Sequence, residues 1–364
     1  MMESIVNDAL SDKEPAGQEN KFKDEAADEE LKNVLKDLKT KIYIVGLGGA
    51  GCNTINRISD EGIRGAELVA ANTDAQDLLS TRANRKILMG KRITRGLGAG
   101  AKPDVGQKAA EEAEEKFQEI LGDADIVFLT CGLGGGTGTG SVGTAAKIAK
   151  EAGALTIAVL TRPFDAEGKS RAQNAQWGIE RLRGVADTVI TIPNDKLLEL
   201  VPRLSLNKAF KVADEILMRS IKGMTEIVTK PGIVNLDFND LKTIMESSGQ
   251  AMIGMGESTA NSNQRALEAI DQAINSPLLD VDISGATGAL LNVTGDSDMT
   301  VGEAEAVAEE IEKRIKPGAK IIWGCRVDPT MDDKLRVMLV ATGVKSDHIY
   351  GRDLQRKGPV EQVY

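Results

Sequence analysis

The residues best suited to chemistry in this chain are glycines gathered in one short run at 131–141, which reads CGLGGGTGTGS. The run follows an apolar stretch at 125–130 and leads into a helix-like segment at about 138–151. A glycine loop between a strand and a helix start exposes backbone N–H groups at the positive end of the helix, and such a site binds phosphate or another anion. Glycine suits this loop because it accepts positive φ and lets a ligand approach the main chain. A plain linker is the alternative, but a linker would not be framed by a strand and a helix.

A second glycine loop lies upstream at 46–51 and reads GLGGAG. Taken alone, it is the G-x-G-x-x-G fingerprint of a dinucleotide fold. The acidic residue that a dehydrogenase needs is expected about 20 positions further on, and Asp74 comes somewhat late for that role. A Walker phosphate loop is not supported either, because Cys52 and Ser141 stand where that motif requires lysine. Two glycine loops on consecutive parts of one sheet instead suggest a nucleoside triphosphate held from both sides.

Composition excludes several classes of protein. The 364 residues suffice for two domains with substantial cores, and the net charge of −10 argues against a broad nucleic-acid-binding surface. The three cysteines are scattered, which fits a reducing compartment and no disulfide or metal pattern. His348 is the single histidine, so a histidine-based triad or metal site is not expected. With no signal peptide and no apolar stretch long enough to cross a membrane, we expect a soluble cytoplasmic protein without direct membrane insertion.

Strand-like and helix-like segments alternate from 41 to about 195, which is typical of an α/β fold with a parallel sheet. The apolar runs at 126–129 and 155–160 are continuous, and this favours strands covered on both faces. Ligands bind such sheets at the carboxyl ends of the strands, where both glycine loops are expected. We predict strands at 41–45, 67–72, 86–89, 125–130, 155–160 and 188–192, and helices at 50–60, 103–120, 138–151 and 168–183.

A long helix with a wide apolar face is predicted from Ser205 to about Val228, and it is expected to connect two halves of the chain. Beyond it, the pattern indicates an α+β domain with a small sheet. Its helices are predicted near 238–247, 262–274 and 300–315, and its strands at 250–257, 288–294, 319–327 and 335–342. We therefore divide the chain into an N-terminal extension with an amphipathic helix (1–39), a Rossmann-like nucleotide-binding domain (40–204), the connecting helix (205–230), the second α+β domain (231–345) and a polar tail (346–364).

Four motifs in this order resemble those of the FtsZ family, the prokaryotic tubulin-like cell-division GTPases. They are GLGGAGCN at 46–53, GGGTGTG at 134–140, PND at 193–195 and NLDFND at 235–240, and the second is highly specific for the tubulin superfamily. The likeness covers roughly 40–345. It implies a protein that binds GTP or GDP with Mg²⁺, hydrolyses GTP, and polymerises head to tail into the filaments of a cell-division ring at mid-cell.

The resemblance also implies where the phosphates lie. The two glycine loops would contact the α and β phosphates, a third loop at 96–102 would close on the γ-phosphate, and the end of the second strand would lie near Mg²⁺. That ion would be held mainly by the phosphates and water. The residues so implied are Gly48, Gly49, Ala50, Asn53, Gly136, Thr137, Gly138, Thr139 and Gly140 for the two loops, Ala99 and Gly100 for the third loop, and Asn72 and Asp74 for the strand end.

By the same resemblance, Glu167 and Arg171 contact the ribose, and Asn194, Phe210 and Asp214 hold the base. The spacing of Glu167 and Arg171 fits an exposed i,i+4 salt bridge equally well. Phe210 and Asp214 share one face of the long helix, so a base stacked on the ring can reach the carboxylate. Guanine offers two N–H donors along one edge, which a carboxylate accepts, whereas adenine presents an acceptor there. Core packing is the alternative for Phe210.

Catalytic residues are implied in the motif at 235–240, namely Asn235, Asp237 and Asp240. The connecting helix of about 23 residues would carry this loop roughly 35 Å from the base, since each residue rises 1.5 Å. One subunit cannot then bring these carboxylates onto its own nucleotide. In a head-to-tail stack, the loop of one subunit would position water at the nucleotide of the next. Without the resemblance, an Asp/Asn-rich helix cap is the default interpretation of the motif.

Three other functions are alternatives to this interpretation. They are a tubulin-like cytoskeletal paralogue that shapes cells, an NAD-dependent oxidoreductase resting on the first glycine loop, and a nucleotide-binding filament without catalysis. The second glycine loop argues against the oxidoreductase, and Asp237 and Asp240 argue against the inert filament. The tail at 346–364 is shorter and more basic than the adaptor-binding tail of the family, so a membrane adaptor bound through it is not favoured.

Overall fold

The structure is a computed structural model, and it describes residues 40–200, 205–230, 232–234, 236–260, 263–279 and 282–344. The extension at 1–39 with its predicted helix, the tail at 346–364 and Asn235 lie outside the described residues. The limits of the segments at both ends of the chain therefore stay predictions.

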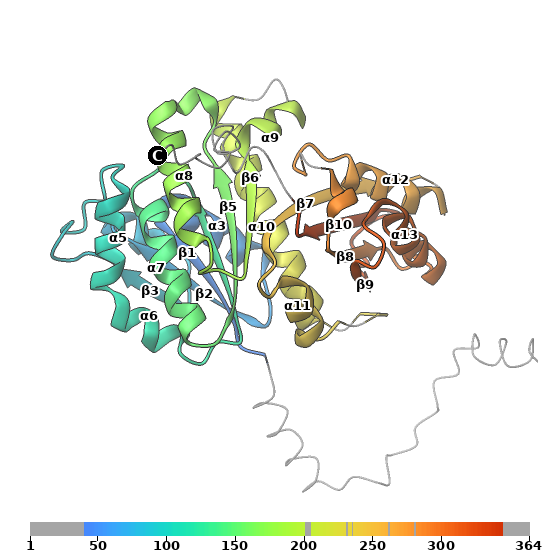
Figure 1. Ribbon diagram of the computed structural model, residues 1–364, viewed down its shortest axis with the longest axis horizontal. Helices are drawn as coiled ribbons and strands as arrows, with labels where there is room; N and C mark the ends of the chain where they lie inside the picture. Colours follow the sequence, from blue (N-terminus) through green and yellow to red (C-terminus); the bar gives the residue numbers. More distant parts are fainter. Residues whose placement is uncertain are drawn as a thin grey trace, which may run out of the picture. The chain divides into compact units, whose positions relative to one another are not determined.

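The first half is built on parallel strands, as the continuous apolar runs predict. Every strand pair between β3 and β6 is parallel, and β1 lies between β2 and β4 (Figure 1). Because all six strands run in the same direction, their carboxyl ends lie at one edge of the sheet, where the glycine loops follow β1 and β4. The strands are β1 (Ile42–Leu47), β2 (Ala66–Asn72), β3 (Arg85–Leu88), β4 (Ile126–Gly132), β5 (Leu155–Arg162) and β6 (Thr188–Pro193).

The second half continues the same sheet, which differs from the small sheet that we expected. β7 (Gly249–Ser258) pairs parallel with β6 over three residues and antiparallel with β10 (Leu335–Thr342) over eight. β8 (Gly288–Gly295) and β9 (Lys320–Val327) complete the sheet in the order β3-β2-β1-β4-β5-β6-β7-β10-β8-β9. The physical reason is the length of β7, whose first residues reach β6 while the rest of the strand pairs with β10.

Helices cover both faces of this sheet. In β1, Val45 and Leu47 belong to one buried core and Ile42 and Ile44 to the other, because successive side chains of a strand point to opposite faces. The first core is completed by α5 (Pro103–Glu112), α6 (Glu114–Leu121), α7 (Thr137–Glu151), α8 (Lys169–Leu182), α12 (Asn263–Ile274) and α13 (Val301–Arg314). The second is completed by α3 (Gly48–Glu61), α10 (Leu206–Thr229) and α11 (Phe238–Met245).

Two short helices and one helix break were not predicted. α4 (Ala75–Ser80) and α9 (Asn194–Leu200) follow β2 and β6 almost directly, and both are too short to show a helical period in the sequence. The single helix predicted at 103–120 is divided at Ala113, whose φ of −101° and ψ of 10° are not helical. The break turns the chain between α5 and α6.

The connecting helix α10 is the longest described helix, and its 24 residues span about 36 Å. It packs closely against the second half, because a Cβ on Gly223 would lie 2.8 Å from the sulfur of Met338 in β10. Asn292 of β8 also donates a hydrogen bond to the Gly223 carbonyl oxygen at 3.2 Å. None of the described helices is long and apolar enough to cross a membrane.

Candidate nucleotide site

A cavity of about 240 Å³ opens at the carboxyl ends of the parallel strands, between the two glycine loops and the start of α10. Eleven of the residues predicted to bind the nucleotide line it together. They are Gly48, Gly49, Ala50, Gly136, Thr137, Gly138, Glu167, Arg171, Asn194, Phe210 and Asp214. Segments up to 167 residues apart in the sequence thus meet at one place, since Leu47 and Asp214 share this cavity.

The two glycine loops touch each other at the floor of the cavity. A Cβ on Gly48, whose φ is +70°, would lie 2.9 Å from the backbone nitrogen of Gly138. Both positions require glycine for close approach, since a Cβ on Gly138 would lie 2.9 Å from the Leu47 carbonyl oxygen, and Gly48 requires it for its positive φ as well. Gly48 begins α3 and Thr137 begins α7, so the N-termini of two helices converge here, which is an arrangement suited to bind phosphate.

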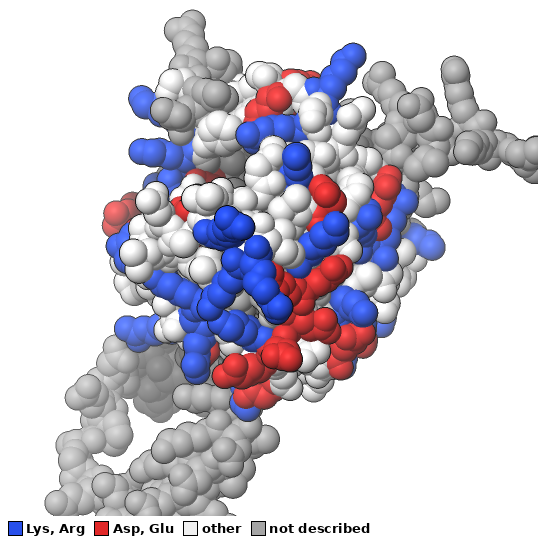
Figure 2. Space-filling view, turned by 90° about the vertical axis from the view of Figure 1, so that its left-hand side faces the viewer, with Lys and Arg blue, Asp and Glu red and all other residues white. Residues whose placement is uncertain are grey.

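The third loop packs directly against the second. A Cβ on Gly136 would lie 2.7 Å from the backbone nitrogen of Lys102 and 2.9 Å from the Ala99 side chain. This loop lies in a segment, 91–102, that contains four exposed cations and no acidic residue. Figure 2 views the side of the molecule that carries α5, and it shows lysine and arginine gathered in one area beside an area of aspartate and glutamate.

The end of β2 forms a polar network at the edge of the first glycine loop. Asn72 accepts hydrogen bonds from the backbone nitrogens of Thr73 and Asp74 at 2.8 and 3.2 Å, and it donates to Asp77 at 2.6 Å. Asp74 caps α4, and the Thr73 hydroxyl lies 2.6 Å from that of Thr137 in the second loop. The network therefore joins the end of β2 to the second glycine loop.

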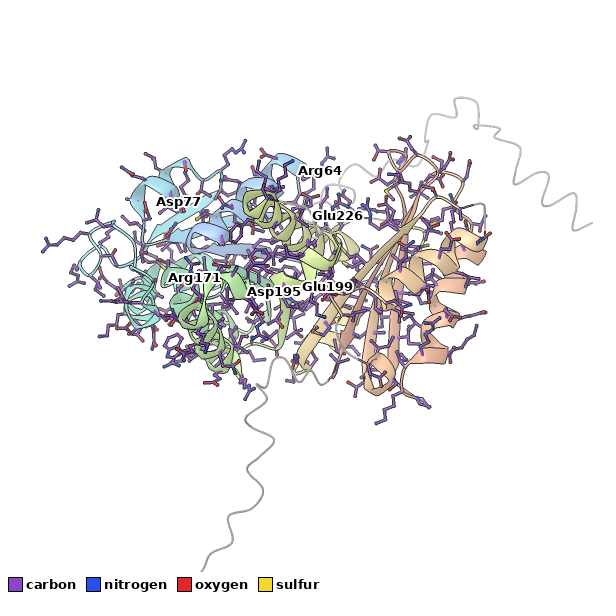
Figure 3. The ribbon with its side chains drawn as sticks, turned by 90° about the horizontal axis from the view of Figure 1, so that it is seen from above. Arg64, Asp77, Arg171, Asp195, Glu199 and Glu226 are labelled. Carbon is purple, nitrogen blue, oxygen red and sulfur yellow. The ribbon has the colours of Figure 1, made fainter. Side chains whose placement is uncertain are left out.

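Asp77 is a candidate that sequence reasoning missed. Its carboxylate oxygen lies 3.5 Å from the position that a Cβ on Gly49 would take, and Figure 3 labels it on the pale blue part of the ribbon. Burial raises the pKa of Asp77, with a further increase from the charge of Asp74 and a decrease from the Asn72 hydrogen bond. Only the short helix α4, which the sequence did not reveal, turns this side chain toward the loop.

Glu167 and Arg171 form the salt bridge that the i,i+4 spacing predicts, at 2.8 Å, and both also line the cavity. Glu167 additionally accepts a hydrogen bond from the backbone nitrogen of Phe164 at 2.9 Å. The two interpretations of this pair are thus compatible. The carboxylate is held in place by the arginine and the backbone, at the wall of the cavity where α8 begins.

The base end of the cavity combines an aromatic ring, a carboxylate and an amide. Phe210 is 36% exposed and lines the cavity, and its ring meets that of Phe164 edge to face, with centroids 5.2 Å apart. Asn194 is buried, and its Oδ1 atom has no hydrogen-bond partner in the described part of the chain. An unpartnered buried acceptor of this kind fits a ligand that donates a hydrogen bond.

Burial and an ion pair shift the pKa of Asp214 in opposite directions. Burial raises its pKa to about 6, and the guanidinium of Arg57, 3.9 Å away, opposes the increase. The Asp214 side chain has an exposed fraction of 17%. A ligand with two N–H donors would stabilise its charged form, because hydrogen bonds to a carboxylate favour ionisation.

Seven of the residues predicted to bind the nucleotide do not line the cavity as the structure describes it. Thr139 and Gly140 have structural contacts instead, since the Thr139 hydroxyl accepts from Gly134 at 2.9 Å and a Cβ on Gly140 would lie 2.1 Å from the Pro103 carbonyl oxygen. The others are Asn53, which is exposed on α3, Asn72 at the end of β2, and Asp74, Ala99 and Gly100 in the neighbouring loops.

Seven lining residues were not singled out from the sequence. Three belong to the glycine run at 131–141, and three others lie at or next to the end of a strand; the full set is Leu47, Gly132, Leu133, Gly135, Thr161, Pro163 and Ala213. The position after a predicted strand at the glycine-loop edge was the signal that could have found Leu47, Gly132 and Thr161.

The predicted catalytic loop lies at the far end of α10 from Phe210, and about 30 Å of helix separates Phe210 from Thr229. Asp237 is the N-cap of α11, where it accepts from the backbone nitrogen of Asp240 at 2.9 Å, and Asp240 accepts from the nitrogen of Asp237 at 3.0 Å. The helix-cap interpretation is therefore also realised. The cap fixes both carboxylates at the surface, where Asp237 is exposed and Asp240 half-buried.

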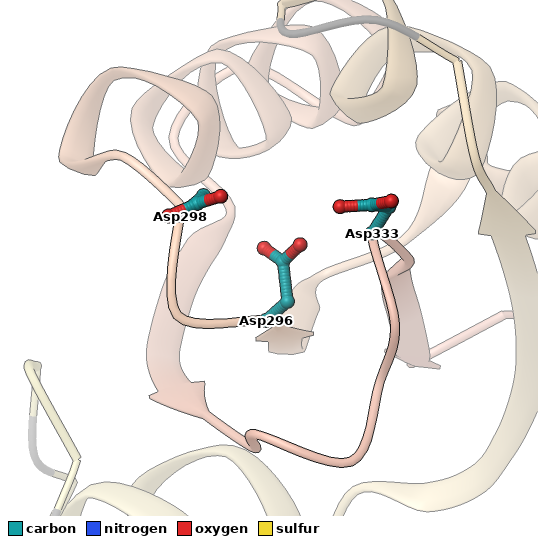
Figure 4. A group of neighbouring side chains, drawn as sticks. All are labelled: Asp296, Asp298 and Asp333. Atoms are coloured by element: carbon teal, nitrogen blue, oxygen red, sulfur yellow. The ribbon is translucent and has the colours of Figure 1, made fainter.

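Among the described residues, three carboxylates in the second half also lie close enough to hold a metal ion. Ligand atoms of Asp296, Asp298 and Asp333 are all within 4.8 Å of one another, and Figure 4 shows the side chains facing a common space. Asp296 is already paired with Arg265 at 3.2 Å, so its charge is balanced without a cation. We therefore place the nucleotide chemistry in the first cavity.

Comparison with known proteins agrees with this geometry. Residues 41–202 match the Tubulin/FtsZ family GTPase domain, and residues 249–345 match the C-terminal domain of the FtsZ family. Cell division protein FtsZ 1 of Archaeoglobus fulgidus is 55% identical, with 100% of this chain and 98% of the relative covered. Cell division protein FtsZ of Haloferax mediterranei is 54% identical over 100% and 99%.

Solved structures are similar over most of the described chain. An empty FtsZ dimer of M. jannaschii superposes with a TM-score of 0.83 at 53% identity, covering 87% of this chain and 92% of that one. CetZ1 of Haloferax volcanii, a GDP-bound monomer, shares the fold with a TM-score of 0.75 at 22% identity, covering 85% and 97%.

Proposed function

The chain belongs to the FtsZ family and is a GTPase of the cell-division cytoskeleton, and from this premise we propose that its active site is completed only between two copies of the chain. It binds guanine nucleotide and associates with itself. One copy supplies the cavity at the carboxyl edge of the parallel strands. The next copy in a head-to-tail filament supplies Asp237 and Asp240. The observation that carries the proposal is the placement of these groups at opposite ends of α10.

Guanine would be read at the base end of the cavity. Asp214 accepts the N1–H and N2–H donors of the base, Asn194 offers the buried Oδ1 acceptor, and Phe210 stacks on the ring. Glu167 and Arg171 hold the ribose, and the glycine loops bind the phosphates with backbone N–H groups. Adenine would leave Asp214 facing a lone pair, so ATP should bind at least about tenfold more weakly, a difference of about 1.4 kcal/mol.

A magnesium ion fits the phosphate end of this site. Mg²⁺ keeps several waters and is usually held by one or two carboxylates together with substrate phosphates. Asp77 presents such a carboxylate at the first glycine loop, and Asn72 holds it in place. Asp74 stands beside it and caps α4. When bound, the ion would neutralise charge on the phosphates, while the residues of the chain position them.

Hydrolysis requires mostly positioning of water and stabilisation of charge. Asp237 and Asp240 are held by their reciprocal cap, in which each side chain accepts one backbone N–H. A carboxylate that is already oriented loses little freedom when it meets the nucleotide of a neighbour. Asn235 belongs to the same loop and is proposed with them. We place the resulting filaments at the division site, as the ring scaffold.

Mixing two inactive variants tests the shared site. Asp240→Asn keeps an acceptor for the helix cap but loses the charge, so it should bind GTP and assemble yet hydrolyse poorly. Asp214→Ala should bind GTP weakly while its own Asp240 stays intact. In an equal mixture, random assembly puts a competent cavity against a competent loop at about a quarter of contacts, and GTP hydrolysis should return there.

The matched control is Asn239→Ala, an exposed position in the same first turn of α11, which should leave the rate of hydrolysis unchanged. Sedimentation with GTP must first show that both inactive variants enter one filament. If they co-assemble and the mixture stays inactive at every ratio, the carboxylate acts within its own subunit or not at all, and the shared-site proposal is wrong.

A further inference from the structure

A second cavity, of about 320 Å³, lies at the end of α8 that is remote from the nucleotide. The cavity is lined by buried apolar side chains, which are Ile179 and Leu182 of α8 and Ala186 of the following turn. Val189 of β6 also lines it and is half-buried. Gln250 of β7 also lines the cavity, next to its strand partner Val189. An apolar cavity of this size accommodates one or two large apolar side chains, and it has no role in the proposed GTP hydrolysis.

Gln250 adds a specific polar requirement to this cavity. Its side-chain nitrogen Nε2 is buried and has no hydrogen-bond partner in the described part of the chain. A buried donor without an acceptor destabilises the protein, because it has lost its hydrogen bonds to water. An occupant that brings a carbonyl oxygen next to its apolar side chains, as an extended peptide does, would satisfy it.

The chain itself passes the mouth of this cavity. Thr342, the last residue of β10, pairs with Ala251, and the backbone nitrogen of Gly343 then donates to the carbonyl oxygen of Gln250 at 3.2 Å. Val344, the last described residue, is 4% exposed. The residues that follow it therefore start one strand spacing from a cavity wall, about 5 Å away.

We propose that the segment at 345–350, which reads KSDHIY, docks in this cavity and places Ile349 and Tyr350 against the apolar wall. Five residues beyond Val344 reach up to about 17 Å, which is ample for this distance. A backbone carbonyl of the segment accepts from Gln250 Nε2. Asp347 of the segment is matched by Arg183 at the rim of the cavity.

Docking at this place ties the end of the second half to α8 of the first. Leu182 lies at one end of this helix and Arg171 near the other, about 17 Å along the axis, where Arg171 lines the nucleotide cavity. Figure 3 labels Arg171 on the green part of the ribbon that holds this helix. Docking of this segment is independent of GTP hydrolysis between subunits.

Cysteine cross-linking in the full chain tests the docking. The natural cysteines Cys52, Cys131 and Cys325 are buried, and burial raises the pKa of Cys52 to about 11 and that of Cys131 to about 12, so engineered thiols react selectively. Ile349→Cys is combined with Val189→Cys in the cavity, or with Lys320→Cys as the matched control. Lys320 is exposed and lies two strand spacings from Thr342 on its other side, about 10 Å away.

The first pair should form an intramolecular disulfide at least tenfold faster than the control pair, at a rate that does not change on dilution. Equal rates for the two pairs would mean that the segment does not dock. Cross-linked dimers would mean that the occupant comes from a second copy, which also overturns the proposal.

A second measurement does not rely on cross-linking geometry. With Ile349→Cys alone, maleimide labelling should be at least tenfold slower than with Gln355→Cys further along the chain. Val189→Trp fills the cavity and should bring the two labelling rates together. Similar rates before the cavity is filled would contradict the docking, and bound guanine nucleotide serves to show that each variant is folded.

Discussion

Replacing Asp214 with asparagine should stabilise the nucleotide-free protein while weakening its affinity for GTP. Burial raises the pKa of Asp214 from 3.8 to about 6, so the ionised carboxylate is held in the folded state against an unfavourable desolvation. Each pH unit corresponds to about 1.4 kcal/mol, which gives an upper limit of about 3 kcal/mol at pH 8. Solvent reaches part of the group and Arg57 attracts it, so we expect Asp214→Asn to gain about 1–2 kcal/mol.

The dependence on pH has a definite sign. The folded-state pKa is above the unfolded value, so the folded protein binds the extra proton and the penalty disappears as the pH falls from about 6 to 4. The stability advantage of Asp214→Asn should therefore be largest at pH 7–8 and vanish near pH 4. Urea denaturation of the nucleotide-free protein at these pH values measures it.

Affinity for GTP should change in the opposite direction. Hydrogen bonds to a carboxylate are worth about 1.5–3 kcal/mol, so the loss of the charge should weaken GTP binding roughly 10- to 150-fold. Below about pH 6, wild-type affinity should also fall by about tenfold per pH unit, because the proton on Asp214 must leave before guanine binds. The affinity of Asp214→Asn should lack this decrease.

Glu215→Gln is the matched control. Glu215 neighbours Asp214 on α10 and also pairs with Arg57, at 3.2 Å, but it does not line the cavity. It should change GTP affinity little. A less stable Asp214→Asn protein at pH 8 would show that the attraction to Arg57 outweighs burial, and an unchanged GTP affinity would refute the assignment of Asp214 to guanine.

Three further changes probe packing and the site. Gly140→Ala should lower the free energy of unfolding by about 2–4 kcal/mol in urea denaturation, because a Cβ there would lie 2.1 Å from the Pro103 carbonyl oxygen. Gly302→Ala, in open space on α13, should instead raise it by about 0.5–1 kcal/mol. Equal effects would contradict the close packing of α5 and α7. Gly135→Ala also meets open space and should keep wild-type stability, so a loss of GTP affinity measured by titration would locate the ligand beside it, and an unchanged affinity would exclude that contact. Arg265→Met leaves the buried carboxylates of Asp296 and Glu303 without their cation, so the free energy of unfolding should fall by about 3–5 kcal/mol at pH 7 and recover on acidification. Wild-type stability of this variant at pH 7 would show that these ion pairs contribute nothing.

Sequence reasoning succeeded where a single local pattern decides the structure. The continuous apolar runs of β4 and β5 can be buried on both faces only in a covered parallel sheet, so the fold of the first half followed from them. The glycine loops after β1 and β4 were placed correctly at the carboxyl edge for the same reason. The long apolar face of α10 likewise required two partners, and the structure supplies them.

It was incomplete where tertiary contacts decide. The six residues of α4 show no helical period, so the approach of Asp77 to the first glycine loop could not be foreseen. The pairing of β7 with both β6 and β10 depends on strand register between distant segments, which no local pattern encodes. Thr139 and Gly140 belong to the most specific motif of the chain, yet their contacts are with Gly134 and Pro103. Such a motif contains residues that hold the loop in place by packing as well as residues that bind the ligand.

The narrow joint between β6 and β7 gives the subunit a preferred line of bending. Eight residue pairs join β7 to β10 and six join β5 to β6, but only three join β6 to β7. The two parts of the sheet are thus connected by a short stretch of strand pairing that can act as a hinge, and α10 packs against the sheet on one face. In a filament, a force transmitted from the nucleotide site of one subunit to the loop at the far end of α10 must pass through this hinge. Elastic strain would then accumulate inside each subunit, and the curvature of the polymer would be set by this joint as well as by the contact between neighbours.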